Sequence, residues 1–204
     1  MDKNPLLIGV LTSDITYNIS TLNQIQEDNS CIFQTIFLLS DKPEVVTNNK
    51  NIIPSFLLGE GLNRREEGFH QKVSSQILKK SLEFKIDLLF LDGFYIILTD
   101  PLISSYNGRI LNFHPSLLPK FGGRGMFGIH VHEAVLAAGE KQTGCTMHLV
   151  DAGIDSGEIL SQQIVEVNPG ETAKSLAQKV IQSRGVAFVK AIKILQKRIH
   201  NSTS

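Results

Sequence analysis

The chain has 204 residues, of which 20 are basic and 20 acidic, so its formal net charge is zero. That balance gives no electrostatic support for a nucleic acid or a membrane surface as partner, and no segment reaches the roughly 20 apolar residues of a membrane span. Together with only two cysteines, Cys31 and Cys145, these properties predict a cytoplasmic, single-domain protein over residues 1–204 that carries free thiols and acts on a small molecule.

In the first half of the chain, short apolar runs alternate with a helical segment. The runs over residues 6–11 and 32–39 end in polar or proline-containing turns, which predicts two buried strands. A helix is predicted over residues 67–84, and a third buried strand over residues 86–91. The apolar stripe of that helix consists of Phe69, Val73, Ile77 and Leu78. This alternation is typical of an α/β fold with a mostly parallel sheet flanked by helices.

Shorter elements follow in the second half. Its sequence predicts a helix that opens at 101–103, a strand over 109–113, a helix over 128–138, two antiparallel strands over 144–150 and 159–167, and a long helix after the turn at 169–172. The long helix carries an apolar stripe of Leu176, Val180, Phe188, Ile192 and Leu195. The polar tail over residues 200–204 is expected to fray.

The most informative motif, Asn112-Phe113-His114-Pro115-Ser116, lies where the strand over 109–113 ends. In open α/β sheets, ligands bind at the carboxyl ends of the strands. Asn112 and His114 are two residues apart, so their side chains project to the same side if the strand geometry persists. Asp155, between the last two strands, adds a carboxylate. An amide, an imidazole and a carboxylate can together run acyl transfer without a metal or a covalent intermediate.

Simpler interpretations exist for each of these residues. His114 can be a loop histidine capped by a backbone group, and Asp155 a turn aspartate bonded to its own backbone. His130 and His132 suggest a metal pair, but on a helix such neighbours point about 200° apart, so no metal is predicted. The run Gly122-Gly123-Arg124-Gly125 is either a phosphate cradle or a mobile connection.

The order and spacing of several motifs resemble the folate-dependent formyltransferases, and among them the phosphoribosylglycinamide formyltransferases. The matching text lies at residues 110–119, 128–135, 144–148 and 155–157, within roughly the central and C-terminal two-thirds of the chain. The resemblance implies a Rossmann-like formyltransferase fold and 10-formyltetrahydrofolate as co-substrate. It also implies a primary amine as acceptor and a role in purine biosynthesis.

The resemblance assigns roles to individual residues. Asn112 would bind the formyl oxygen, His114 would donate a proton, and Asp155 would favour the charged form of His114. Folate contacts would fall on Arg65, on Tyr95, Ile96, Ile97 and Leu98, and on Asn112, Val150, Asp151 and Asp155. Acceptor contacts would fall on Ser13, Asn18 and Arg184.

The acceptor half departs from the family pattern. The family's phosphate loop has the form S-G-x-G-S-N, whereas residues 13–18 read Ser-Asp-Ile-Thr-Tyr-Asn, so both glycines are absent. Asp14 would place a carboxylate near a dianionic phosphate, at a cost on the order of 1 to 4 kcal/mol at ~4 Å unless it turns away. Arg184 stands where the family uses a glutamate, and Ile96 where the family has a folate-side arginine.

These observations predict a formyltransferase, monomeric or homodimeric, whose acceptor is 5'-phosphoribosylglycinamide. One alternative is formylation of another amine, such as an amino sugar nucleotide, because the phosphate loop is altered. Hydrolysis of 10-formyltetrahydrofolate and a non-catalytic folate-binding domain are further alternatives.

Overall fold

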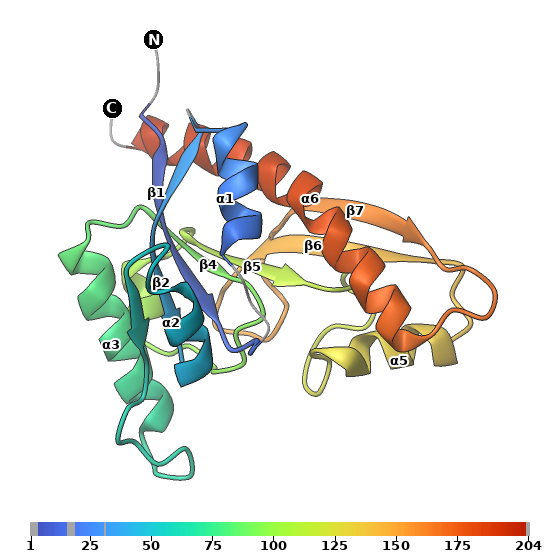
Figure 1. Cartoon of the computed structure of the whole chain (residues 1–204), viewed down its shortest axis with the longest axis horizontal. Helices are drawn as coiled ribbons and strands as arrows, with labels where there is room; N and C mark the ends of the chain where they lie inside the picture. Colours follow the sequence, from blue (N-terminus) through green and yellow to red (C-terminus); the bar gives the residue numbers. More distant parts are fainter. Residues whose placement is uncertain (1–3, 16–18, 31, 203–204) are drawn as a thin grey trace. The chain divides into compact units, whose positions relative to one another are not determined.

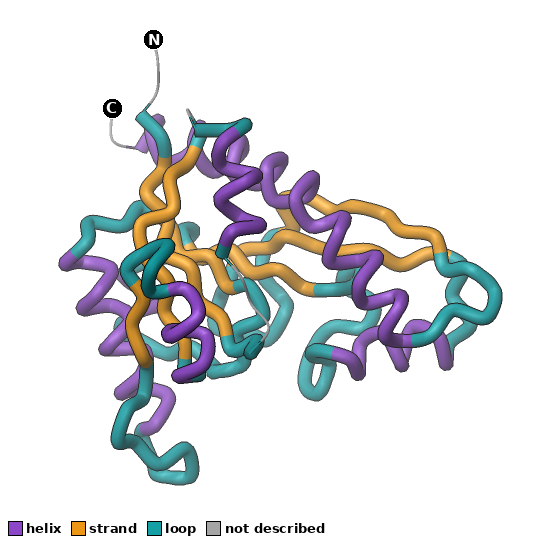
Figure 2. The backbone as a smooth tube through the Cα atoms, in the orientation of Figure 1, coloured by secondary structure: helices purple, strands orange, loops and turns teal. Residues whose placement is uncertain are grey.

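The computed structural model describes residues 4–15, 19–30 and 32–202 (Figures 1 and 2). The chain divides into two compact units, the first made of residues 1–110 and 198–204 and the second of residues 111–197. Hydrogen bonds order the strands as β3-β2-β1-β4-β5-β6-β7. The expected α/β class, with a mostly parallel sheet and an antiparallel C-terminal strand pair, is confirmed.

The first unit is built around parallel strands. Its elements are β1 (Leu6–Thr12), α1 (Ser20–Glu27), β2 (Phe33–Ser40), α2 (Pro43–Asn49), β3 (Ser55–Leu57), α3 (Phe69–Glu83), β4 (Leu88–Leu91) and α4 (Leu102–Ser105). β1 pairs in parallel with β2 and with β4, and β2 pairs in parallel with β3. Strands β1 and β4 are almost wholly buried, as expected for parallel strands that are covered on both faces.

Three elements of this unit were not predicted. Helix α1 has only two apolar residues, Leu22 and Ile25, which are too few for an apolar stripe, and of its eight residues only Leu22 is buried. Strand β3 has three residues, which is too short for a periodic pattern, and α2 is a seven-residue helix with Pro43 at its first turn. The predicted strands and the helix over 67–84 are confirmed within two residues by β1, β2, β4 and α3.

The second unit is antiparallel. It contains most of β5 (Ile110–His114), all of α5 (Ile129–Ala137), β6 (Gln142–Leu149) and β7 (Ile159–Glu166), and most of α6 (Ala173–Ser202). β6 pairs in antiparallel fashion with both β5 and β7, which confirms the predicted strand pair. The expectation that the tail frays from residue 200 is wrong, because α6 continues to Ser202; residues 203–204 lie outside the described part.

Helix α6 covers one face of this antiparallel sheet, and Figure 1 shows it running alongside β6 and β7. Its predicted apolar stripe is buried, and its start is capped by Thr172, whose Oγ1 accepts the Ser175 N–H at 3.1 Å. On β6, Cys145 faces the helix, with Sγ 3.5 Å from Oγ of Ser183. No helix in the described ranges combines the length and apolar character needed to cross a bilayer.

Candidate active site

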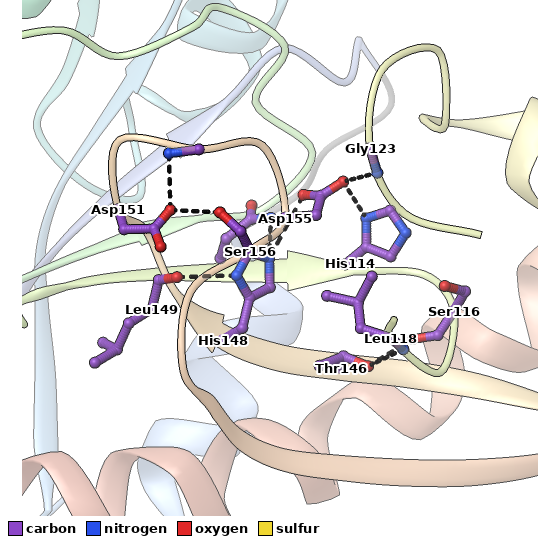
Figure 3. A network of polar contacts seen from close by, with 12 residues as sticks. His114, Ser116, Leu118, Gly123, Thr146, His148, Leu149, Asp151, Asp155 and Ser156 are labelled. Atoms are coloured by element: carbon purple, nitrogen blue, oxygen red, sulfur yellow. Dashed lines mark hydrogen bonds and ion pairs between the residues drawn. The ribbon is translucent and has the colours of Figure 1, made fainter. Parts of the chain in front are cut away.

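Four polar side chains share one face of strands β5 and β6. Asn112 lies opposite His148 across the ladder, and His114 lies opposite Thr146. Residues two apart on a strand point to the same side, so the pairing register brings all four together. His114, Thr146 and His148 are buried and Asn112 is half-buried. Figure 3 shows how the loop that carries Asp155 passes over this face.

Both ring nitrogens of His114 face oxygen acceptors, and Figure 3 shows the contact with Asp155. Nε2 lies 2.8 Å from the carbonyl oxygen of Phe121, and Nδ1 lies 3.5 Å from Oδ2 of Asp155. A carbonyl oxygen only accepts, so Nε2 carries a proton and donates it to Phe121. Because 3.5 Å is an ion-pair distance rather than a normal hydrogen bond, Nδ1 remains available to a third group.

Asp155 places its carboxylate between two histidines. Its Oδ2 accepts the Gly123 N–H at 2.9 Å, and its Oδ1 lies 3.6 Å from Nε2 of His148. The side chain is 13% exposed, so solvent screens its charge weakly. Its backbone is left-handed, with φ of +54°, a conformation that aspartate tolerates better than most residues. The Gly123 bond and this backbone conformation fix the direction of the carboxylate.

The other neighbour of His114, Phe121, also has a left-handed backbone, with φ of +55°. Such a conformation costs roughly 1–3 kcal/mol in a non-glycine residue and persists only where its surroundings hold it. Ser116 contributes to holding this segment, because its hydroxyl donates to the Lys120 carbonyl oxygen at 2.7 Å. The two groups that flank the His114 ring, the Phe121 carbonyl and the Asp155 carboxylate, therefore both belong to residues with a left-handed backbone. Such conformations are common at functional sites.

Thr146 holds the segment that follows His114. Its hydroxyl donates to the Ser116 carbonyl oxygen at 2.6 Å and accepts the Leu118 N–H at 3.0 Å. The carboxamide of Gln162 donates to the same hydroxyl at 2.9 Å and to the Leu118 carbonyl oxygen at 3.0 Å. These bonds tie the chain after His114 to strands β6 and β7, so the position of the imidazole follows from the sheet.

Asp151, a predicted folate contact, braces the loop that leads to Asp155. Its Oδ1 accepts the Ser156 hydroxyl at 2.8 Å and the Gly153 N–H at 2.9 Å. These hydrogen bonds, first that of Ser156, hold the pKa of Asp151 below its usual value. Val150, the predicted contact beside it, is half-buried at the end of β6. Their contact with folate stays a prediction.

His132 is a buried histidine on α5 whose Nδ1 has no hydrogen-bond partner among the described residues. His130, two residues earlier, has a side chain that is 60% exposed, as the helical spacing predicts. Burial, and then the charge of His114, lower the pKa of His132 from 6.5 to about 4. The ring is therefore neutral in the folded protein near neutral pH.

We expect His132 to make the fold sensitive to acid. Between pH 6.5, the pKa of His132 in the unfolded chain, and its folded pKa of about 4, His132 is protonated in the unfolded chain but neutral in the folded chain. The free energy of unfolding therefore falls as the pH falls through this range. At about 1.36 kcal/mol per pH unit the loss approaches roughly 3 kcal/mol. Urea unfolding at about pH 7 and about pH 4.5 measures it. The difference in unfolding free energy between the two pH values should be smaller in His132→Leu than in the wild type and unchanged in His130→Gln. An unchanged difference in His132→Leu would contradict the prediction.

Most predicted ligands of the first unit lie at its strand ends. Ser13 follows β1, where its Oγ accepts the Tyr95 N–H at 3.2 Å and its own N–H donates to the Gly93 carbonyl oxygen at 2.8 Å. Tyr95 and Ile97 are about half exposed, whereas Ile96 and Leu98 are buried. This alternation leaves two of the four predicted folate contacts inside the core of the unit.

The remaining predicted ligand in this unit that the structure describes is Arg65. It is exposed, and its backbone N–H donates to Oδ1 of Asn63 at 3.0 Å. Asn18, the second predicted ligand in the segment after β1, lies outside the described residues. The roles of Arg65, Asn18 and the residues at the strand ends stay predictions.

Arg184, the predicted acceptor ligand on α6, lies away from the polar cluster. Its guanidinium carbon is 5.9 Å from the centroid of the Phe113 ring. Phe113 lies between Asn112 and His114 on β5, so its side chain points to the opposite face of the strand. Arg184 thus belongs to the face that α6 covers, and the structure does not bring it together with Asn112 and His114.

Sequence reasoning missed four contributors to this site: His148, Thr146, Gly123 and Phe121. His148 and Thr146 are two apart in a predicted strand, which signals a shared polar face, but the pairing register is needed to place them beside β5. Gly123 and Phe121 contribute a backbone N–H and a backbone carbonyl, which side-chain chemistry does not reveal. The glycine run thus supplies a donor to Asp155, a role that neither expected interpretation included.

The arrangement can stabilise negative charge and move a proton within one small volume. Asn112 supplies amide N–H donors, and His114 supplies an acidic N–H beside the carboxylate of Asp155. A donor to a developing oxyanion and a positioned proton carrier are the parts that acyl transfer requires. No set of three His, Cys, Asp or Glu side chains suited to a metal ion occurs among the described residues.

Comparison with known proteins gives one consistent family. A family model described as "Formyl transferase" matches residues 7–192. The trifunctional purine biosynthetic protein adenosine-3 of Bos taurus is 31% identical over 191 residues, which cover 92% of this chain and 18% of that protein. The chloroplastic phosphoribosylglycinamide formyltransferase of Arabidopsis thaliana is 29% identical over 188 residues, which cover 91% of this chain and 63% of that protein.

A solved structure shares both the fold and part of the sequence. The phosphoribosylglycinamide formyltransferase of Brucella melitensis is 30% identical with a TM-score of 0.78, and the match covers 96% of each chain. The match therefore covers nearly all of that single enzyme but less than a fifth of the trifunctional relative from Bos taurus.

Proposed function

Because the chain belongs to the formyl transferase family, we propose that it is a folate-dependent N-formyltransferase of one-carbon metabolism. The reaction moves a formyl group from 10-formyltetrahydrofolate to the primary amine of 5'-phosphoribosylglycinamide, a step of purine biosynthesis. The similarity to phosphoribosylglycinamide formyltransferases over almost the whole chain supports this acceptor.

The observation that carries the proposal is the placement of His114 and Asp155 on the face that also holds Asn112. The two ring nitrogens of His114 face the Phe121 carbonyl and the Asp155 carboxylate, at 2.8 and 3.5 Å. The backbone cap expected of an ordinary loop histidine is therefore present, and a half-buried carboxylate faces the other ring nitrogen. A backbone cap alone does not require that carboxylate, so its presence favours a role in proton transfer.

The chemistry assigns a task to each of the three side chains. The amine nitrogen attacks the formyl carbon, and the carbonyl oxygen becomes an oxyanion that accepts an N–H of Asn112. The bond from carbon to the folate nitrogen then breaks, that nitrogen takes up a proton from His114, and the proton lost by the attacking nitrogen returns to His114 directly or through water. His114 is placed to supply the proton, and Asp155 stabilises the imidazolium before transfer.

A second acceptor class, an amine such as an amino sugar nucleotide, is favoured by the end of β1. Asp14 follows Ser13 there, and its N–H donates to Oγ1 of Thr12 at 3.2 Å. Burial, and then the charges of Asp14 and Asp92, raise the pKa of Tyr95. Carboxylates near this strand end oppose a dianionic phosphate, so an acceptor without a phosphate at that point suits the segment better.

An acceptor panel tests the proposal. The purified chain is mixed with 10-formyltetrahydrofolate and each amine at millimolar concentration, and release of tetrahydrofolate is followed. Turnover with 5'-phosphoribosylglycinamide is expected, and turnover confined to an amino sugar nucleotide would transfer the assignment to the second class. Release without any amine would indicate hydrolysis. No release with any acceptor would favour a non-catalytic folate-binding domain, and a measurable rate that His114→Ala leaves unchanged would show that His114 is not the proton donor.

We also propose that residues 1–204 act as one formyltransferase domain, which the family match over residues 7–192 supports, since it includes parts of both units. A cytoplasmic setting fits the buried, free thiol of Cys145. We retain a monomer or a homodimer as the expected state; size-exclusion chromatography with light scattering would decide between them.

A further inference from the structure

His148 connects Asn112 to the backbone through both of its ring nitrogens. Nδ1 lies 3.0 Å from the carbonyl oxygen of Leu149, and Nε2 lies 2.9 Å from Nδ2 of Asn112. The ring is 2% exposed, so water does not compete for either nitrogen. Asn112 and His148 are also direct partners across the β5–β6 ladder, which makes this contact a consequence of the register.

Hydrogen-bond chemistry decides which way both side chains face. The Leu149 carbonyl only accepts, so Nδ1 of His148 must carry the proton. In a neutral ring Nε2 is then an acceptor, and Asn112 has to present its NH2 group to it. The carboxamide is planar, so its oxygen lies on the other side and one N–H of the amide remains free of this bond. A free asparagine could present either end, because its two ends have nearly the same shape.

We propose that His148 is a positioning residue for formyl transfer: its neutral ring, protonated at Nδ1, accepts a hydrogen bond from Asn112 and thereby fixes which end of the carboxamide meets the formyl oxygen. The inference rests on the proposed function, because the second N–H of Asn112 is assigned there to the oxyanion. It adds a residue whose only route to the substrate is through Asn112.

The surroundings of His148 keep its ring neutral near neutral pH. Burial lowers its pKa, and the nearby ring of His114 acts in the same direction, whereas the Leu149 carbonyl and the carboxylates of Asp155 and Asp151 oppose them. The result is a pKa below the ordinary 6.5, so the ring takes up a second proton only in acid.

A second proton on His148 would disturb two groups at once. An N–H at Nε2 would face the NH2 of Asn112, so two donors would meet and the carboxamide would lose its fixed orientation. The charged ring would instead attract Oδ1 of Asp155, now 3.6 Å away. The same carboxylate faces His114, so acid should weaken both the oxyanion donor and the partner of the proton donor.

Two variants separate positioning from simple packing. His148→Gln keeps an oxygen that can accept from Asn112 at every pH, whereas His148→Leu keeps the bulk and removes the acceptor. With the best acceptor of the panel, His148→Leu should lower kcat by about 10- to 100-fold, the usual effect of losing an orienting partner, with a smaller change in KM. His148→Gln should recover most of that loss and keep more of its kcat in acid than the wild type does.

The matched control is His132→Leu, the same substitution at a histidine that is equally buried but has no bond to Asn112. It should leave kcat near neutral pH within about threefold, because the His132 ring is neutral there and its Nδ1 makes no hydrogen bond among the described residues. Equal losses in His148→Leu and His148→Gln would overturn the proposal, because Gln would then fail to replace the acceptor.

A measurement that does not depend on enzymatic turnover separates the positioning role of His148 from the proposed formyltransferase activity. Nitrogen NMR of isotope-labelled histidine reports the tautomer of His148 in the unmodified chain, and the Nδ1–H form is expected near neutral pH. The Nε2–H form would overturn the proposal even if no variant folds. If the expected tautomer is found but the wild type turns over no acceptor, the proposed function fails while the orientation of Asn112 by His148 stands.

Discussion

Replacing Asp155 by asparagine is expected to lower kcat by about 10²- to 10⁴-fold while the protein stays folded. The substitution preserves shape, and an amide oxygen can still accept the Gly123 N–H that now binds Oδ2 at 2.9 Å. It removes the negative charge 3.5 Å from Nδ1 of His114, so the ring loses the carboxylate that would stabilise positive charge on it during proton transfer. The effect should therefore appear in kcat rather than in the unfolding transition.

Asp100→Asn provides the control for Asp155→Asn. Asp100 is also a carboxylate that accepts a backbone N–H, that of Ser104 at 3.0 Å, but it is exposed and belongs to the first unit. Its variant should keep kcat within about twofold, as surface substitutions away from special features usually do. Steady-state rates and urea unfolding of both variants give the comparison. Near wild-type turnover by Asp155→Asn would mean that Asp155 has no part in proton transfer.

The parts of the fold that sequence predicts well are those where hydrophobic pattern and burial coincide. The apolar runs of β1, β2 and β4 correspond to strands that are almost wholly buried. The stripe from Leu176 to Leu195 corresponds to the buried side of α6. Helix α1 could not be predicted in this way because it buries a single leucine. Tertiary contacts rather than its own hydrophobic pattern decide its conformation.

Only part of the candidate site was predictable from sequence. The residue types of Asn112, His114 and Asp155 indicate acyl-transfer chemistry, and the strand spacing predicts that the first two share one face. The groups that orient them depend on the register and on backbone conformation: His148 reaches Asn112 only because the β5–β6 register makes them partners. Phe121 offers its carbonyl to His114 from a left-handed backbone, at φ of +55°, and an aromatic residue gives no local sign of that conformation.

Gly157, the last residue of the Asp155-Ser156-Gly157 motif, has a steric role that the motif alone does not disclose. A Cβ at this position would overlap the carbonyl oxygen of Leu149. That oxygen accepts the Nδ1 proton of His148 at 3.0 Å, and the Leu149 N–H donates to the Glu158 carbonyl oxygen at 2.9 Å. The glycine therefore lets the loop approach the end of β6 closely enough to bring Asp155 next to both histidines.

Gly157→Ala is accordingly expected to lower the free energy of unfolding by roughly 2–4 kcal/mol, from overpacking against backbone and the strained hydrogen bonds around Leu149. It should also lower kcat, because Asp155 and His148 move with the loop. Gly153→Ala is the matched control: its Cβ would meet the Ser156 hydroxyl, a side-chain atom that can rotate away at the cost of one exposed hydrogen bond to Asp151. Urea unfolding and steady-state rates of the two variants measure both effects. Equal stability of the two would show that the loop can shift away from β6 at little cost, and a Gly157→Ala protein with normal kcat would show that the position of Asp155 does not depend on this contact.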